Sequence, residues 1–517
     1  MYMARQGYTW LLLCCSLLLS CSDYEFDNLD AAGNAVRQGK AYLTVTLTMP
    51  QIGDVRSSTN SQGGTDEGTE NATDEECKIT DAYILLGEIA DGMDAPIKVH
   101  SHHYITDFKQ TGNNPALWRA TVQCDPGRYR VMVIANPGKI VSKIAIIGTK
   151  DWNALVRHTL KADNYKNLQT MWQGGNFLMT NAYCGSLNDH DVVLESGRHT
   201  DVEICVQRAC ARFDYQAKNE NNVYFLEVPI DGAVKKVEVQ LKEAALMNVS
   251  NNFNLFKQIV KDNAVGTVPT FYAYETGDNY VYDSDWEVKR YFMTPIFEDW
   301  HTGEYFFYPS ERKKGGTFTD TLAYKDLSTD LSEYGKLFYC SENTVPGPKA
   351  QINKLSTGIV FKGTFSVPGI KVGDIYYYKP TKARSELYTS LEQLREALKK
   401  EGVTLPDAPN DNVLASYSVK RFIRQADGSY PVWFTYWNRH NDNGNDLEMG
   451  IMEFTVVRNN IYKLQVNSIS ALGLPKPPTD PDNPWKPAGD TPDELIPVLD
   501  ITVEVSKWVE RTLDHEI

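Results

Sequence analysis

The chain has 517 residues, of which 42% are hydrophobic and 23% charged, and its formal net charge is −15. This length predicts two to four domains with substantial cores, and an acidic chain without a basic patch argues against a nucleic-acid partner. The sequence has no GxSxG, HExxH or phosphate-binding loop, so we expect neither an enzyme nor a bound cofactor or metal.

Residues 1–20 predict the signal peptide of a lipoprotein. Arg5 precedes two leucine-rich runs that are too short to span a membrane. The run ends in Leu-Leu-Ser before Cys21, which resembles a bacterial lipobox, whose cysteine receives lipid on its sulfur. The acidic residues 22–30 resemble the export tag of surface lipoproteins of Bacteroidetes. We therefore expect Cys21 to anchor an outer-membrane precursor.

Residues 40–49 predict a β-strand with an apolar face and a threonine-rich outer face. The apolar face consists of Leu43, Val45, Leu47 and Met49. Pro50 ends the strand because it cannot donate to a ladder. Arg56 follows, at the start of a polar segment that we expect to be exposed.

A cut between Arg56 and Ser57 would detach this strand together with the lipid anchor. Arg56 is the first basic residue beyond Met49, whereas a cut at Arg37 or Lys40 would leave the strand attached to the body. Residues 21–56 are thus predicted to be a propeptide. The alternative is an ordinary first strand followed by an ordinary loop.

Residues 57–215 predict an N-terminal β domain. The expected strands are 79–87, 118–122, 129–135, 191–193 and 200–215, with one or two short helices between 150 and 172. The mixed apolar run that ends at Tyr215 is typical of a strand near the centre of a sandwich. The polar segment after Tyr215 predicts the domain boundary.

Residues 216–517 predict a C-terminal β domain. Its expected strands are 223–226, 233–245, 430–437, 450–457 and 461–469. A helix is expected over 390–402, where Ser390 and Gln393 form a capping-box pair and Gly402 ends the helix.

The end of the chain predicts a linker and a final strand. Residues 475–494 are rich in proline and predict a stiff, extended linker rather than a packed segment. The tail 495–517 carries one more alternating pattern, which places four apolar residues on one face. These residues are Leu499, Ile501, Val503 and Val505.

Six cysteines lie beyond Arg56, and an exported protein permits disulfides between them. Their spacing does not dictate a pairing, and no CxxC occurs. Buried free thiols remain the alternative for each. The six are Cys77, Cys124, Cys184, Cys205, Cys210 and Cys340.

Other suggestive patterns favour ordinary structure. The histidines of residues 100–103 have a metal-like composition but are better read as exposed polar sequence, and residues 442–446 lack the EF-hand pattern and suit a hairpin loop. The aromatic runs 376–378 and 433–437 could form a sugar platform, but packing in the core is the better interpretation.

Several stretches together resemble the type V pilins, the fimbrillin family of Bacteroidales, and most of all the structural subunit of the short (minor) fimbria. They span most of the chain, and the late stretch is the most specific. They are the lipobox at Cys21, the strand that precedes Arg56, GRYRVMVIANPG at 127–138, RACARFDY at 208–215, WNRHNDNG at 437–444, MEFTVVRNNIYKLQVNSI at 452–469 and the strand-forming tail with Trp508.

The resemblance implies two transthyretin-like β-sandwich domains and export as a lipidated precursor. It also implies removal of the leader by a lipoprotein signal peptidase, cleavage by an arginine-specific surface protease, and polymerisation by strand exchange. Expected partners are other copies of the chain, related fimbrial subunits, and host or bacterial surface ligands. The alternatives are a tip or accessory adhesin, or a surface glycan-binding lipoprotein that keeps residues 21–56 and stays anchored.

Physical chemistry is consistent with strand exchange. A detached first strand would leave a groove with unpaired backbone groups and an apolar floor, to which a neighbour's strand can add by β-augmentation. Burying four apolar side chains of the tail there is worth roughly 6–12 kcal/mol, from which the cost of ordering the tail is subtracted.

Overall fold

The structure is a computed structural model. It describes residues 39–49, 69–111, 117–138, 151–162, 168–182, 190–261, 270–271, 279–284, 306–307, 322–327, 333–344, 355–370, 373–380, 385–440, 445, 452–480, 482–485 and 498–509. Within these segments, no helix is both long and apolar enough to cross a membrane.

The described part of the chain is mainly β, with a few short helices, so the predicted fold class of packed β-sheets is confirmed. The helices are α1 (Asp74–Cys77), α3 (Trp152–Val156), α6 (Leu391–Lys400) and α7 (Asp411–Ser416), with single 3-10 turns η3 (Thr170–Trp172) and η4 (Glu220–Asn222).

Among the described residues, the N-terminal half forms a nine-stranded sheet. Its path is β4 (Lys98–Ile105), β3 (Ala82–Glu88), β7 (Gly127–Ala135), β9 (Met179–Asn181), β11 (His199–Arg208), β1 (Ala41–Thr48), β6 (Trp118–Cys124) and β5 (Lys109–Gln110), and β10 (Asp191–Leu194) pairs with β7. The first strand of the described chain therefore lies inside the sheet.

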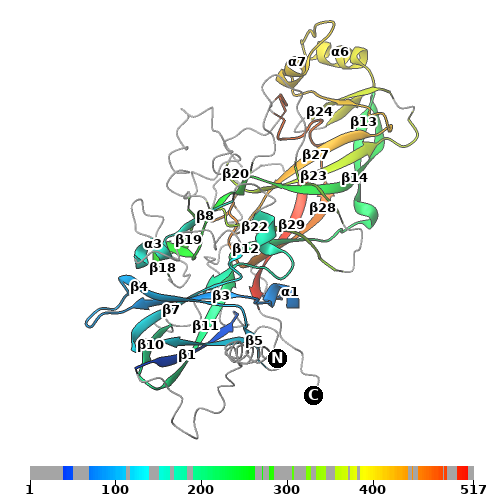
Figure 1. Ribbon diagram of the computed structural model, residues 1–517. Helices are drawn as coiled ribbons and strands as arrows, with labels where there is room; N and C mark the ends of the chain where they lie inside the picture. Colours follow the sequence, from blue (N-terminus) through cyan, green and yellow to red (C-terminus); the bar gives the residue numbers. More distant parts are fainter. Residues whose placement is uncertain are drawn as a thin grey trace, which may run out of the picture.

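A five-stranded sheet joins the two halves of the described chain. Its order is β2 (Thr69–Asn71), β29 (Leu499–Val509), β28 (Asn460–Ile469), β12 (Cys210–Tyr215) and β22 (Gly335–Ser341). In Figure 1 this sheet lies between the nine-stranded sheet at one end of the molecule and α6 and α7 at the other.

The C-terminal half contains an eight-stranded sheet, again counted over the described residues. Its strands are β26 (Lys420–Ile423), β24 (Ile375–Lys379), β25 (Glu386–Tyr388), β13 (Val223–Ile230), β14 (Ala233–Met247), β23 (Gly358–Ser366) and β27 (Tyr430–Trp437), with β21 (Lys325–Asp326) beside β14. Asp231 and Gly232, both at positive φ, form the two-residue turn between β13 and β14.

Three small sheets complete the described structure. They are β15 (Val249–Ser250) with β20 (Phe306–Phe307), β16 (Asn252–Asn254) with β8 (Thr159–Lys161), and β18 (Thr270–Phe271), β17 (Gln258–Lys261) and β19 (Asn279–Tyr282).

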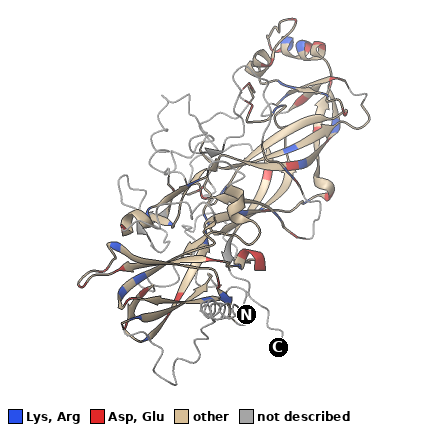
Figure 2. Cartoon of the chain, viewed as in Figure 1, with Lys and Arg blue, Asp and Glu red and all other residues tan. Residues whose placement is uncertain are grey.

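One large apolar cluster extends through both halves of the described structure, beside three smaller ones. A single cluster of buried side chains includes Leu47 of β1, Phe213 of β12 and Val239 of β14. Basic and acidic residues are interspersed along the described strands, and the acidic helix α1 lies where the two halves meet (Figure 2). The halves are therefore joined by packing and not only by the connecting chain.

The run expected as one strand from 200 to 215 is two strands in different sheets. β11 ends at Arg208 in the nine-stranded sheet, and β12 begins at Cys210 in the five-stranded sheet. The chain thus passes between the sheets at Ala209, a few residues before the predicted boundary. The division into 57–215 and 216–517 stays a prediction.

Two further expectations for the C-terminal half differ from the structure. The described part of the expected strand 450–457 is a turn, with Met452 at positive φ and one isolated bridge from Val456 to Asn343. The described part of the proline-rich segment is packed: Asn483 is 1% exposed, and Trp485 donates a 2.7 Å hydrogen bond from Nε1 to the carbonyl of Val419. These side-chain contacts outweigh the tendency of proline-rich sequence to remain extended.

Candidate functional site

β1 lies between two neighbours for most of its length. It pairs in parallel with β11 and antiparallel with β6. The four residues of the predicted apolar face, Leu43, Val45, Leu47 and Met49, are at most 1% exposed. Since both edges of β1 form ladder pairs, its removal would open a slot with two unpaired edges and an apolar floor.

The threonine-rich face of β1 is covered as well. Thr44 Oγ1 lies 2.9 Å from Thr121 Oγ1 of β6. Arg119 of β6 reaches Asp201 of β11, with 2.6 Å between NH2 and Oδ1. Because Arg119 pairs with Thr46 and Asp201 pairs with Thr44, this ion pair passes over the outer face of β1. The strand is therefore enclosed on both faces.

At its C-terminal end β1 meets a fully buried arginine. Arg208 NH2 lies 3.3 Å from the sulfur of Met49 and 3.6 Å from the sulfur of Cys77. The same guanidinium donates from Nε to the backbone carbonyl of Glu76 at 3.0 Å and from NH1 to Asn459 Oδ1 at 3.3 Å. Arg208 therefore joins the end of β1 to α1 and to the turn that precedes β28.

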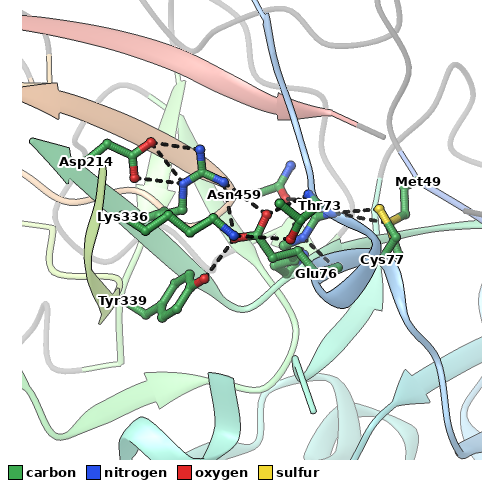
Figure 3. A network of polar contacts seen from close by, with 10 residues as sticks. Met49, Thr73, Glu76, Cys77, Asp214, Lys336, Tyr339 and Asn459 are labelled. Carbon is green, nitrogen blue, oxygen red and sulfur yellow. Dashed lines mark hydrogen bonds and ion pairs between the residues drawn. The ribbon is translucent and has the colours of Figure 1, made fainter. Parts of the chain in front are cut away.

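The carboxylate of Glu76 is the centre of a buried ionic network (Figure 3). It accepts hydrogen bonds from Arg212 NH1 at 3.1 and 3.0 Å and from the Tyr339 hydroxyl at 2.8 Å, and it pairs with Lys336 at 3.1 Å. Arg212 also pairs with Asp214 at 2.8 Å. The network thus ties α1 to β12 and β22.

Local sequence fixes the position of Glu76. Thr73 caps α1, and its backbone N–H donates to Glu76 Oε2 at 2.8 Å, which completes a capping box. Burial alone would raise the pKa of the Glu76 carboxyl, but Arg212, the Thr73 N–H, Lys336 and Arg208 outweigh burial and lower that pKa from 4.5 to about 2. Glu76 is therefore ionised at neutral pH.

The C-terminal strand lies in a sheet of its own chain. β29 pairs antiparallel with β28 from Leu499↔Ile469 to Lys507↔Asn460. Leu499 and Val505 are buried, and Ile501 and Val503 pack half-buried against the same core. The expectation that the linker holds the tail clear of the fold is wrong for this structure, because β28 offers β29 both a pairing edge and an apolar surface.

The last residues of β29 have a second partner. β2 pairs with them in parallel, in the register Thr69↔Lys507, Glu70↔Trp508 and Asn71↔Val509. β2 directly precedes α1 in the sequence. The segment downstream of the predicted cleavage site therefore touches the end of the predicted donor strand.

The structure does not place every predicted site residue. Cys21, Arg56 and Ser57 lie outside the described residues. Among the described residues no group of three or more His, Cys, Asp or Glu is arranged to hold a metal ion. His100 lies on β4 between Glu88 and Asp125, 3.5 Å from each.

The cysteines divide into two groups. Cys205 is disulfide-bonded, whereas Cys77, Cys124, Cys210 and Cys340 are buried and not in disulfides. Cys184 lies outside the described residues. Burial raises the pKa of the Cys124 thiol to about 12, so that thiol is unreactive at neutral pH.

The aromatic runs pack as expected. Tyr376, Tyr377 and Tyr378 are at most 6% exposed, and Trp433 and Trp437 are also buried. These five rings therefore do not form a sugar-binding platform in this structure.

Sequence reasoning missed the buried network. Its signal was present, because Arg208, Arg212 and Asp214 interrupt an apolar run that was expected to be central in a sandwich. Charged residues in such a run need buried partners. The identity of those partners, above all Glu76, depends on contacts between distant parts of the chain.

The C-terminal part of the chain matches a known protein family. Residues 430–514 match the family model described as the major fimbrial subunit protein type IV, fimbrillin, C-terminal. This region contains β27, β28 and β29. No curated protein matches the chain in sequence.

Solved structures of low similarity match most of the chain. A protein of Parabacteroides distasonis proposed to act in cell adhesion has 12% identity and a TM-score of 0.43, and covers 91% of this chain and 100% of its own. A fimbrilin of Porphyromonas gingivalis W83 has 13% identity and a TM-score of 0.39, with 92% and 99% covered. A tip fimbrial protein of Porphyromonas gingivalis has 12% identity and a TM-score of 0.35, with 91% and 100% covered.

The match of residues 430–514 confirms the fimbrillin resemblance, whereas the narrower likeness to the short fimbria stays a prediction. The family is one of fimbrial subunits and so of surface fimbriae. Residues 430–514 are therefore similar to the C-terminal part of the fimbrillins.

Proposed function

We propose that this chain is a structural subunit of a cell-surface fimbria that polymerises by donor-strand exchange. The precursor is a lipoprotein of the outer membrane, anchored at Cys21. An arginine-specific protease hydrolyses the peptide bond between Arg56 and Ser57, and β29 of another copy then fills the slot that β1 leaves. The fibre supports adhesion and biofilm formation through host or bacterial surface ligands.

The observation that carries this proposal is the position of β1. It is an interior strand with its apolar face wholly buried, and the predicted cleavage site follows it by a few residues. An uncut chain therefore presents no open slot. Loss of β1 would expose the edges of β11 and β6, which recruit a strand from another chain.

The match between the two strands supports β29 as the replacement. Leu43, Val45, Leu47 and Met49 alternate along β1 as Leu499, Ile501, Val503 and Val505 alternate along β29. Burial of four such side chains is worth roughly 6–12 kcal/mol. In the resting chain β29 already buries part of this surface against its own core, so the gain on exchange is the difference between the two sites.

The proposal is tested by treating purified precursor with an arginine-specific protease. Wild-type protein should give a new N-terminus at Ser57 on sequencing and should then form fibres. Arg56→Ala should remain a longer monomer that keeps residues 40–49, and the control Arg37→Ala should assemble like wild type because its change lies upstream of β1. Fibres of Arg56→Ala with residues 40–49 still attached would contradict the proposal.

A further inference from the structure

The segment Thr69–Cys77, made of β2, the capping turn and α1, contacts both β29 and the side chains that surround the end of β1. β2 holds the end of β29, since among the described pairs Trp508 and Val509 have ladder partners only in β2. In Figure 1 the end of β29 lies beside α1. We call Thr69–Cys77 the clasp.

The clasp is firmly fixed to the body of the molecule. The carboxylate of Glu76 is 1% exposed and has partners on β12 and β22. Removing one member of such a buried charge network is strongly destabilising, because it leaves the other charges buried without compensation. As long as this network is intact, β2 is held in register with β29.

The clasp also contacts two side chains that lie next to β1, one from β6 and one from the end of β11. Trp118 of β6, which pairs with Leu47 of β1, donates from Nε1 to the backbone carbonyl of Cys77 at 3.0 Å. Arg208 lies against Met49 and donates to the backbone carbonyl of Glu76. Two carbonyls of α1 therefore accept hydrogen bonds from side chains that β1 helps to bury.

Departure of β1 would change these two hydrogen bonds. The side chains of Leu47 and Met49, each at most 1% exposed, would no longer shield Trp118 and Arg208 from water. Water would then compete for both donors, and a hydrogen bond open to water contributes less than one in a dry interior. The clasp would lose part of its support on the side that faces the slot.

We propose that the clasp holds β29 in its own sheet while β1 fills its slot, and loosens its hold when β1 leaves. This inference rests on the proposed function, because it gives β29 its role as donor strand. An uncut subunit would then have neither an empty slot nor an available donor. Departure of β1 after cleavage would open the slot and release the donor in one step, which prevents premature polymerisation in both directions.

The first test locks the clasp to β29. Thr69→Cys and Lys507→Cys, combined in one full-length precursor, place two cysteines at directly paired positions. After oxidation the protein should still be cut at Arg56 but should not assemble, and reduction should restore assembly. The control pair Glu227→Cys and Lys236→Cys joins directly paired residues of β13 and β14 and should assemble whether oxidised or reduced. Assembly of the locked clasp at the control rate would overturn the inference.

The second test loosens the clasp without cleavage. An Arg56→Ala chain keeps its slot filled, so it can join a fibre only by donating β29. Adding Glu76→Gln to Arg56→Ala should raise its incorporation at the ends of wild-type fibres by about tenfold or more. The control Glu243→Gln, from a pair with Lys362 in which both side chains are about a third exposed, should not change incorporation. Equal incorporation of the two variants would overturn the coupling.

Failure of the clasp and failure of strand exchange give different results. If β29 is not the donor, reduced Thr69→Cys, Lys507→Cys protein still assembles and Val503→Asp assembles too. If β29 is the donor but the clasp is not involved, Val503→Asp blocks assembly while Glu76→Gln does not raise the incorporation of the Arg56→Ala chain.

Discussion

Because Glu76 ionises, the ionic contacts that join α1 to β12 and β22 depend on pH. Its pKa is lowered from 4.5 to about 2 in the folded chain, so the stability it contributes is present above pH 4.5 and is lost as the pH falls towards 2. The difference corresponds to about 3 kcal/mol of unfolding free energy. Urea unfolding should therefore show Glu76→Gln destabilised by about 3 kcal/mol at pH 7 and much less at pH 2.5.

A matched control separates this effect from the loss of any carboxylate. Glu243 pairs with Lys362, and both side chains are about a third exposed. Glu243→Gln should change the unfolding free energy by less than about 1 kcal/mol at either pH. If the unfolding free energies of Glu76→Gln and wild type depend equally on pH, Glu76 does not hold α1 to β12 and β22.

Residue patterns predicted where helices begin, but they did not predict which buried charged residues contact each other. Ser390 and Gln393 indicated the start of α6, and the Gln393 N–H does donate to Ser390 Oγ. The contact between Glu76 and Arg212 could not be predicted in this way, because it joins residues far apart in the sequence. Arg212 showed only that some buried anion had to be present.

One substitution in β29 tests both its packing in its own sheet and its proposed role as the donor strand. Val503 pairs with Leu464 of β28 and packs half-buried against the core. Val503→Asp should lower the melting temperature of the uncut monomer, because it places a carboxylate against apolar side chains, and should also block polymerisation of the cut protein.

Thr502→Asp is the control for Val503→Asp. Thr502 is exposed on the opposite face of β29, where its hydroxyl accepts a hydrogen bond from Asn467. The variant should keep the melting temperature near that of wild type and should still polymerise. If both variants assemble alike, β29 is not the donor strand.

At the scale of elements, alternation predicted strands well and misread one buried segment. β27 has the predicted bounds Tyr430–Trp437, and β1 and β28 lie within a residue of theirs. The expected strand 450–457 failed because Phe454 and Val456 are buried without forming a ladder, apart from one bridge. Apolar residues predict burial, but a strand also needs a neighbour with unpaired backbone groups.

At the scale of the whole molecule, the sequence predicted many of the long strands, but it missed others such as β4, β22 and β23 and did not predict how the strands are ordered. β1 lies between β11 and β6, and β12 lies between β28 and β22. These neighbours come from distant parts of the chain, and their pairing is set by long-range packing. The same limit explains why the tail was expected outside the fold, whereas β29 lies in a sheet of its own chain.

Under the proposed function, a lipid anchor at Cys21 would be joined to the body through β1 alone once the bond after Arg56 had been cut. Cys21 and β1 are on the same side of that cut, so the body would stay at the membrane only as long as β1 stays in its slot. Four buried apolar side chains hold it there, with roughly 6–12 kcal/mol of burial energy. Detachment from the membrane and strand exchange should therefore be one event.

Vesicle flotation tests this expectation with lipidated precursor. After the cut, the body should float with the vesicles until cut subunits from a second preparation are added, and it should then leave the vesicles as fibres form. Cys21→Ala should incorporate no labelled palmitate and should never float. A cut body that leaves the vesicles at once, with no second subunit present, would show that β1 does not hold the chain and that release precedes exchange.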